Sequence, residues 1–324
     1  MGKERRTARG VLALCALGVA ASLGAGSILQ ARAPARGALS KPTPAGAPAP
    51  SVAMRSALPE LPAIDLSPEA RRHLTRSIEL TAQGRFDQAR ASCRAVMSQV
   101  SPAVISACVA PIDGLTGRYE VARHSLERAL DTAGSLEQQV WLYTLLGELA
   151  YWNGDLQRAE QALGSALALA PTQRRLLGLH VDLLLDTGRA RQALSVLAGQ
   201  DTDDGMLLRE TLAYQQLGLV QAARASAQRL QRRYDEAAMR GTPAPLRDEA
   251  RFYVNMPGHE RRALELSRAS FAQGQSPWDA RLLLEAAVHL GDARAAQPAL
   301  AWLRRTNLES PALHLLAAQL TFAH

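Results

Sequence analysis

Hydrophobic and polar residues follow three different patterns along the chain. An uncharged, mostly apolar run spans Val11 to Leu29, and a stretch dense in Pro, Ala and Gly follows it to about Pro62. From Ser67 onward the apolar residues are mostly Ala and Leu, and they do not alternate with polar residues for long. Ala and Leu favour helices, whereas sandwiches and barrels need alternating runs of β-branched and aromatic residues. The pattern therefore predicts an all-α protein.

A glycine followed five residues later by an alanine recurs seven times after residue 67. Successive glycines are 30 to 40 residues apart, and 34.5 on average over the six intervals, which is typical of helix-turn-helix repeats. We expect each glycine to end a first helix in a left-handed conformation, and each alanine to lie where two helices cross closely. The pairs are Gly84 and Ala89, Gly117 and Ala122, Gly154 and Ala159, Gly188 and Ala193, Gly218 and Ala223, Gly258 and Ala263, and Gly291 and Ala296.

Serines mark the expected starts of several first helices. Four Ser-Pro pairs lie about fifteen residues before an observed or expected glycine, where serine would cap a helix and proline would open it. These pairs begin at Ser67, Ser101, Ser276 and Ser310, and Ser135 with Gln138 forms a capping box in the third repeat. In the second repeat Pro111 lies inside the expected first helix, which predicts a kinked or short helix there.

With this period the sequence resembles the tetratricopeptide repeat family, whose unit is about 34 residues long with small residues at fixed places. The third repeat matches best, at Tyr143, Leu146, Gly147, Gly154, Ala159, Leu163, Ala166 and Pro171. The resemblance covers roughly residues 68–324 and identifies no particular member. It implies that residues 67–324 form a right-handed α-solenoid, or superhelix, of about seven helix-turn-helix repeats with a closing C-terminal helix.

The resemblance also implies that first helices line a concave groove, which binds a peptide or a helix of a partner protein. Aromatic side chains beside acidic ones suit a partner with Arg, Lys or apolar anchors. The alternative is that the aromatic residues pack between helices and the charged residues face water. The family's groove positions correspond to Trp141, Thr144, Glu148, Tyr151, Trp152, Asp182, Asp186, Gln215, Asn255, Arg281, Glu285 and His289.

The formal charge of +7 is concentrated at the N-terminal end. Residues 1–57 hold eight cationic residues and one acidic residue, so the remaining chain is neutral. A neutral body with interspersed charges offers no extended basic face to phosphates, and we therefore expect no nucleic-acid partner.

The N-terminal features are typical of an exported protein. A basic stretch before an apolar run predicts that residues 1–30 are either a cleaved signal peptide or an N-terminal membrane anchor. Residues 31–66 are predicted to be a disordered linker rich in Pro and Ala. The protein would then be periplasmic, or anchored in the inner membrane through residues 11–29 and facing the periplasm.

Two cysteines lie in the predicted repeats, Cys93 on a second helix and Cys108 on the following first helix. In an oxidising compartment a disulfide over this fifteen-residue separation would stabilise the fold by about 3 kcal/mol on the chain-entropy model. The alternative is that both are small, buried apolar residues.

The spacings typical of enzyme sites are missing from the sequence. There is no phosphate-binding glycine loop, G-x-S-x-G elbow, HExxH or Cys-x-x-Cys pair, and no histidine pair has metal-ligand spacing. We therefore expect no catalytic residue, metal or cofactor, and a non-catalytic protein-protein interaction scaffold in the cell envelope. Alternatives are a membrane-tethered subunit of an envelope assembly or secretion machine, and a helical-cleft hydrolase using paired carboxylates such as Asp182 and Asp186.

Overall fold

The computed structural model describes residue 61 and residues 64–199, 203–242 and 244–322. All of them belong to one structural unit, residues 49–324. The described part contains fifteen helices and no strand, so the all-α prediction is confirmed. In chain order the helices are α2 (Pro68–Ala82), α3 (Phe86–Arg94), α4 (Pro102–Leu115), α5 (Tyr119–Asp131), α6 (Leu136–Asn153), α7 (Leu156–Leu169), α8 (Arg174–Asp186), α9 (Ala190–Leu197), α10 (Asp204–Gln216), α11 (Val220–Met239), α12 (Leu246–Val254), α13 (Glu260–Gln273), α14 (Pro277–Leu290), α15 (Gln297–Thr306) and α16 (Pro311–Phe322).

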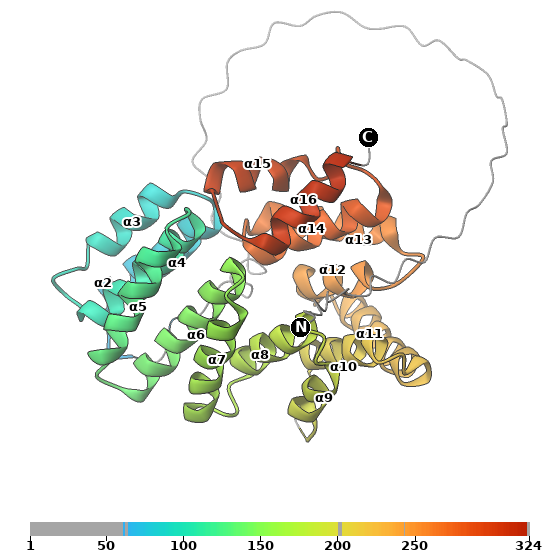
Figure 1. The fold of residues 1–324 in the computed structure, drawn as a ribbon, viewed down its shortest axis with the longest axis horizontal. Helices are drawn as coiled ribbons and strands as arrows, with labels where there is room; N and C mark the ends of the chain where they lie inside the picture. Colours follow the sequence, from blue (N-terminus) through green and yellow to red (C-terminus); the bar gives the residue numbers. More distant parts are fainter. Residues whose placement is uncertain (1–60, 62–63, 200–202, 243, 323–324) are drawn as a thin grey trace, which may run out of the picture. The chain divides into compact units, whose positions relative to one another are not determined.

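The helices follow one another as an array of hairpins. Within the described residues, α2 to α15 form seven hairpins and α16 follows as a closing helix (Figure 1). Each first helix packs on the second helix of its own hairpin, and most hairpins also pack on the next one along the chain. Because each hairpin buries its apolar side mainly against its neighbours, stability is distributed along the array.

The glycine and alanine of each repeat have the roles expected from the sequence. All seven glycines have positive φ angles, between 67° and 85°, and each lies in the turn that follows the first helix of its hairpin. The seven alanines are buried, with exposed fractions of 8% or less. A small residue at this point lets the two helices of a hairpin approach each other closely.

Serine caps begin four of the first helices. In each of the four, the hydroxyl oxygen accepts a hydrogen bond of 3.1 to 3.4 Å from the backbone N–H three residues later. The hydroxyl of Ser310 makes no hydrogen bond to a described residue, so the expected cap of α16 is missing there. The four capping residues are Ser67, Ser101, Ser135 and Ser276.

The first helix of the second hairpin is not shortened by its internal proline. Helix α4 continues through Pro111 as far as Leu115. Ala110 and Ile112, on either side of the proline, are almost fully buried. Packing against the neighbouring helices therefore outweighs the loss of one backbone hydrogen bond.

The packed part of the chain begins before Ser67, within the stretch predicted to be linker. Ile64 is buried in a cluster with Leu74 and Val104, and Leu61 packs against the same cluster. Arg71 also donates a hydrogen bond of 3.0 Å to the backbone oxygen of Ile64. The predicted signal or anchor (1–30) and most of the predicted linker (31–66) lie outside the described residues. No described helix has the length and apolar character needed to cross a bilayer.

The C-terminal helices make a contact that the hairpin pattern does not predict. Helices α14 to α16 lie against α6 and against the turns that end α2, α4 and α6, and we call this the closing contact (Figure 1). The backbone N–H of Gln275 donates to the oxygen of Ala82, with 2.8 Å between nitrogen and oxygen. A Cβ atom added at Gly117 would lie 2.8 Å from the backbone oxygen of Asn307. At Gly154 it would lie 2.9 Å from Pro311.

Candidate functional site

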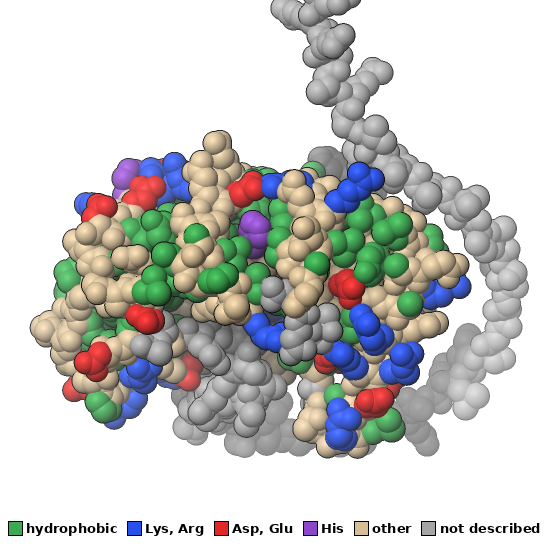
Figure 2. Space-filling view, turned by 90° about the horizontal axis from the view of Figure 1, so that it is seen from below, with side chains coloured by type: hydrophobic (Ala, Val, Ile, Leu, Met, Phe, Trp, Pro, Cys, Tyr) green, Lys and Arg blue, Asp and Glu red, His purple; other side chains and the backbone are tan. Residues whose placement is uncertain are grey.

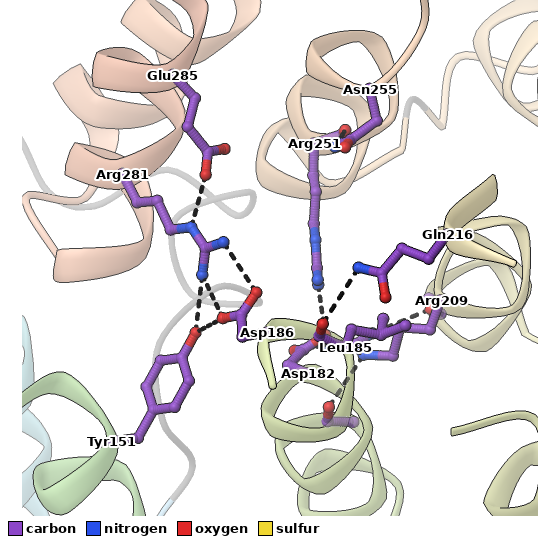
Figure 3. A network of polar contacts seen from close by, with 12 residues as sticks. Tyr151, Asp182, Leu185, Asp186, Arg209, Gln216, Arg251, Asn255, Arg281 and Glu285 are labelled. Carbon is purple, nitrogen blue, oxygen red and sulfur yellow. Dashed lines mark hydrogen bonds and ion pairs between the residues drawn. The ribbon is translucent and has the colours of Figure 1, made fainter. Parts of the chain in front are cut away.

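Polar side chains from five helices meet beside the closing contact. They come from four first helices of neighbouring hairpins, α6, α8, α10 and α12, and from α14, which lies across from α6 and α8 (Figure 3). We call this set the inner network, and it consists of Tyr151, Asp182, Asp186, Arg209, Arg251, Arg281 and Glu285.

Asp182 lies between two arginines at one end of the inner network. Its side chain is only 3% exposed. Arg209 donates to both carboxylate oxygens over 2.7 and 3.0 Å, and Arg251 lies 2.7 Å from Oδ1. Arg209 also donates to the backbone oxygens of Gly178 and Gly205, so its guanidinium is fixed on several sides. A buried carboxylate with two cationic partners is fully compensated in charge and joins three successive first helices.

Arg281 of α14 occupies the other end of the network. Its guanidinium donates to both oxygens of Asp186 over 2.5 and 2.9 Å, and to the hydroxyl of Tyr151 over 2.8 Å. The same side chain donates to Glu285, one turn further along α14, over 2.7 Å. The Tyr151 hydroxyl in turn donates to Asp186. These bonds join the seventh hairpin to the third and fourth.

The charges of this end are only partly shielded from water. The side chains of Arg281, Asp186 and Glu285 are 21% to 25% exposed. Burial alone would raise the pKa of Asp186, but the hydrogen bonds and charge of Arg281 outweigh it, and the pKa lies below its ordinary value. Burial raises the pKa of Tyr151 well above its ordinary value, so Tyr151 stays a neutral hydrogen-bond donor.

Three aromatic rings lie next to these polar groups. Trp278 of α14 stacks on Tyr151, with ring centroids 5.4 Å apart and planes inclined by 19°. The rings of Trp152 and Trp278 are nearly perpendicular, with centroids 4.8 Å apart. The guanidinium carbons of Arg251 and Arg281 lie 5.7 and 5.9 Å from the Trp278 ring centroid. Trp278 therefore contributes stacking and cation-π attraction to the closing contact.

The start of α14 is held firmly, which fixes both Trp278 and Arg281. Ser276 caps the helix, and Asp279 is buried, with Arg247 of α12 donating to its two oxygens over 2.8 and 3.0 Å. Ser270 of α13 donates to the same carboxylate over 2.6 Å. Because Trp278 and Arg281 are three residues apart in the first turns of α14, both side chains lie on one side of the helix.

The structure brings only part of the predicted groove residues together. Tyr151, Trp152, Asp186, Arg281 and Glu285 meet at the closing contact, so the helix α14 lies across this part of the inner side. The charged members do not simply face water, since each is ion-paired. Asp182 joins the network through Arg209 and Arg251.

The other predicted groove residues have separate partners. The hydroxyl of Thr144 donates to the backbone oxygen of Val140 over 2.7 Å, and Arg175 donates to Glu148 over 2.8 Å. Gln215 donates to the backbone oxygen of Asn255 over 3.2 Å. The last two residues lie apart from these contacts: Trp141 packs in the cluster around Ile64, and His289 is exposed near the end of α14.

Sequence reasoning missed three members of the site: Arg209, Arg251 and Trp278. Trp278 was detectable, because it lies one helical turn before Arg281, which the family positions did include. Arg251 has the same relation to Asn255, four residues later. Arg209 has no comparable signal, since its partner Asp182 is 27 residues away.

Cys93 and Cys108 form a disulfide, with 2.00 Å between the sulfur atoms and 5.9 Å between the Cα atoms. The bond joins α3 to α4, and therefore the first hairpin to the second. The hydroxyl oxygen of Ser77 in α2 lies 3.1 Å from the sulfur of Cys93. Three consecutive helices thus meet at this bond, on the hairpins that α14 to α16 contact.

Arginines hold the two acids that the sequence offered as a carboxylate pair. Asp182 is paired with Arg209 and Arg251, and Asp186 is paired with Arg281. Asp248 of α12 has a raised pKa, because burial outweighs the opposing charges of Arg209 and Arg251. Among the described residues, no group of three or more His, Cys, Asp or Glu side chains could hold a metal ion.

Acidic and basic side chains are interspersed on the face shown in Figure 2, among apolar ones. This distribution is in line with the interspersed charges of the sequence after residue 57.

Comparisons with known proteins give likenesses in fold alone. No protein-family model matches the chain, and no curated protein matches it. A solved tetratricopeptide repeat protein from Parabacteroides merdae is 13% identical, with a TM-score of 0.46 over 79% of this chain and 100% of that one. PilW, a type IV pilus biogenesis factor, is 18% identical, with a TM-score of 0.37 over 66% and 97%. Yeast Tom70 is 10% identical, with a TM-score of 0.38 over 82% and 65%.

Proposed function

We propose that this chain, which has the fold of a tetratricopeptide-type array of hairpins, is a non-catalytic scaffold that binds a protein or peptide partner in the cell envelope. The inner network carries the proposal, because it gathers aromatic, acidic and basic side chains from neighbouring first helices. Fixed groups of this kind recognise a partner's side chains through stacking and charge-assisted hydrogen bonds. Its acids are all held by arginines, which suits recognition better than proton transfer.

Export is the second part of the proposal. A basic stretch and the apolar run from Val11 to Leu29 begin the chain, and the Cys93–Cys108 disulfide suits an oxidising compartment. The chain would act either free in the periplasm or tethered to the inner membrane, with the proline-rich stretch as a spacer. N-terminal sequencing of the protein from soluble and membrane fractions distinguishes the two forms. A protein found only in the cytoplasm with free thiols would contradict both.

Site-specific photo-crosslinking tests partner binding on the inner side. A photoreactive amino acid replaces Asn255, which is exposed and next to Arg251, or Val121 of the second helix α5, which is 57% exposed, as the matched control. We expect a discrete crosslinked partner from position 255 in intact cells and none from position 121. Equal crosslinking at both positions, or crosslinking at position 121 alone, would contradict an inner binding surface.

A further inference from the structure

Helix α14 occupies the part of the inner side where the family's groove positions cluster. Trp278 and Arg281, one helical turn apart, place an aromatic ring and a guanidinium on Tyr151 and Asp186. These two contacts join residues that are 127 and 95 positions apart in the sequence. Chain connectivity through neighbouring hairpins does not require them.

The side chains that α14 places here are of the kind that Tyr151, Trp152 and Asp186 would bind if α14 moved away. Tyr151 and Trp152 provide ring faces and edges, and Asp186 provides a carboxylate that accepts two hydrogen bonds in parallel. Aromatic pairs and bidentate arginine-carboxylate pairs are specific in geometry. A helix with an aromatic residue and an arginine three positions later matches both groups at once.

The closing contact joins hairpins that are not neighbours in the chain. Each hairpin also packs within itself and on its neighbours, so the contacts of α14 with Tyr151 and Asp186 are additional to the array. Its ionic groups are about a fifth to a quarter exposed, and water can therefore reach and replace their partners.

We propose that α14 is an internal substitute for the partner. A partner helix with an aromatic residue and an arginine one turn apart displaces Trp278 and Arg281 from Tyr151 and Asp186, while α14 moves away from α6 and α8 together with the helices that are packed on it. The inference rests on the function proposed above and adds the chemistry of the partner and an autoinhibited state. Competition with α14 would restrict binding to segments that reproduce both side chains.

The test uses full-length protein in which the closing contact is weakened outside the site. Gly117→Ala and Gly154→Ala together place Cβ atoms 2.8 Å from Asn307 and 2.9 Å from Pro311. The matched control is Gly188→Ala with Gly218→Ala, where the φ angles are equally positive and a Cβ would meet no described atom within 4 Å. Both pairs therefore share the strain of alanine in a left-handed conformation, and only the first pair disturbs the closing contact.

The probe is a fluorescein-labelled synthetic peptide with the sequence of residues 276–290, which contains α14. A second peptide has Trp278→Ala and Arg281→Ala. We expect the opened protein to bind the first peptide at least tenfold more tightly than the wild type or the control pair does. Adding Asp186→Asn to the opened protein should weaken this binding about tenfold. Circular dichroism establishes that each variant keeps its helix content.

Several results would overturn the proposal. They are equal affinity of the opened and control proteins, binding that does not depend on the tryptophan and arginine of the peptide, or no measurable binding to any variant. The result is independent of the crosslinking experiment. If the peptide binds as expected and no partner is crosslinked in cells, the proposed function fails and the internal occupation of the site stands.

Discussion

Replacing Arg281 with methionine removes the guanidinium that connects α14 to α6 and α8 while keeping much of the side-chain length. Asp186 then loses two hydrogen bonds and its cationic partner, and the hydroxyl of Tyr151 loses a donor. Breaking a fully buried pair costs about 3–5 kcal/mol, and breaking an exposed pair costs at most about 1 kcal/mol. Because these side chains are 22% and 25% exposed, we expect a loss of about 2–3 kcal/mol in the free energy of unfolding.

Urea unfolding followed by circular dichroism measures this loss. The matched control is Arg262→Met, since Arg262 pairs with Glu249 over 3.0 Å but is 50% exposed. The free energy of unfolding of Arg262→Met should fall by no more than about 1 kcal/mol. If the array unfolds in two steps, the effect of Arg281→Met should fall on the step that releases the C-terminal helices. A double-mutant cycle with Asp186→Asn should give a coupling of at least about 1 kcal/mol.

A loss in Arg281→Met no greater than in Arg262→Met would contradict a stabilising role of the pair between Arg281 and Asp186. A coupling near zero between positions 281 and 186 would contradict that role as well. Either result would mean that the closing contact contributes little in solution, and that the ion pair merely accompanies the packing of Trp278.

Three further measurements test other parts of the structure. Reducing the disulfide between Cys93 and Cys108 should lower the free energy of unfolding by about 3 kcal/mol, and urea unfolding with and without dithiothreitol measures it; an unchanged midpoint would contradict a stabilising bond. Gly147→Ala should destabilise by about 1–3 kcal/mol, because its Cβ would lie 2.7 Å from Leu163. Gly164→Ala, where a Cβ meets no described atom within 4 Å, should stabilise by up to about 1 kcal/mol, and thermal melts that rank the two variants the other way would contradict this difference. The lowered pKa of Asp186 stabilises the fold fully above its unfolded pKa, so the stability difference between the wild type and Asp186→Asn should be constant from pH 5 upward and shrink as the pH falls below about 4; a difference independent of pH would count against the ion pair.

The hairpins were predictable because their determinants are local. A glycine with positive φ and a buried alanine five residues later recur in each repeat, and both roles depend on a few neighbouring residues. The serine caps of Ser67 and Ser101 depend on a backbone N–H only three residues away. Helix α4 is an exception, since packing around Ala110 and Ile112 decides its length against the local preference of proline.

The closing contact was not predictable in this way. Tyr151 and Trp278 lie in different repeats, and the repeat period says nothing about which distant repeats touch. Family groove positions identified Tyr151, Asp186 and Arg281 as residues of the inner side, but as contacts for a partner and not for one another. Their mutual contact depends on the accumulated rotation from hairpin to hairpin, to which every packed residue between them contributes.

The contact between Arg281 and Asp186 sets a limit on how the array can change its length. An open array tolerates the gain or loss of a hairpin, because each one meets only its neighbours. Here a hairpin inserted between α8 and α14 would carry the arginine away from its carboxylate by a full repeat. Insertions between these helices should therefore be confined to loops.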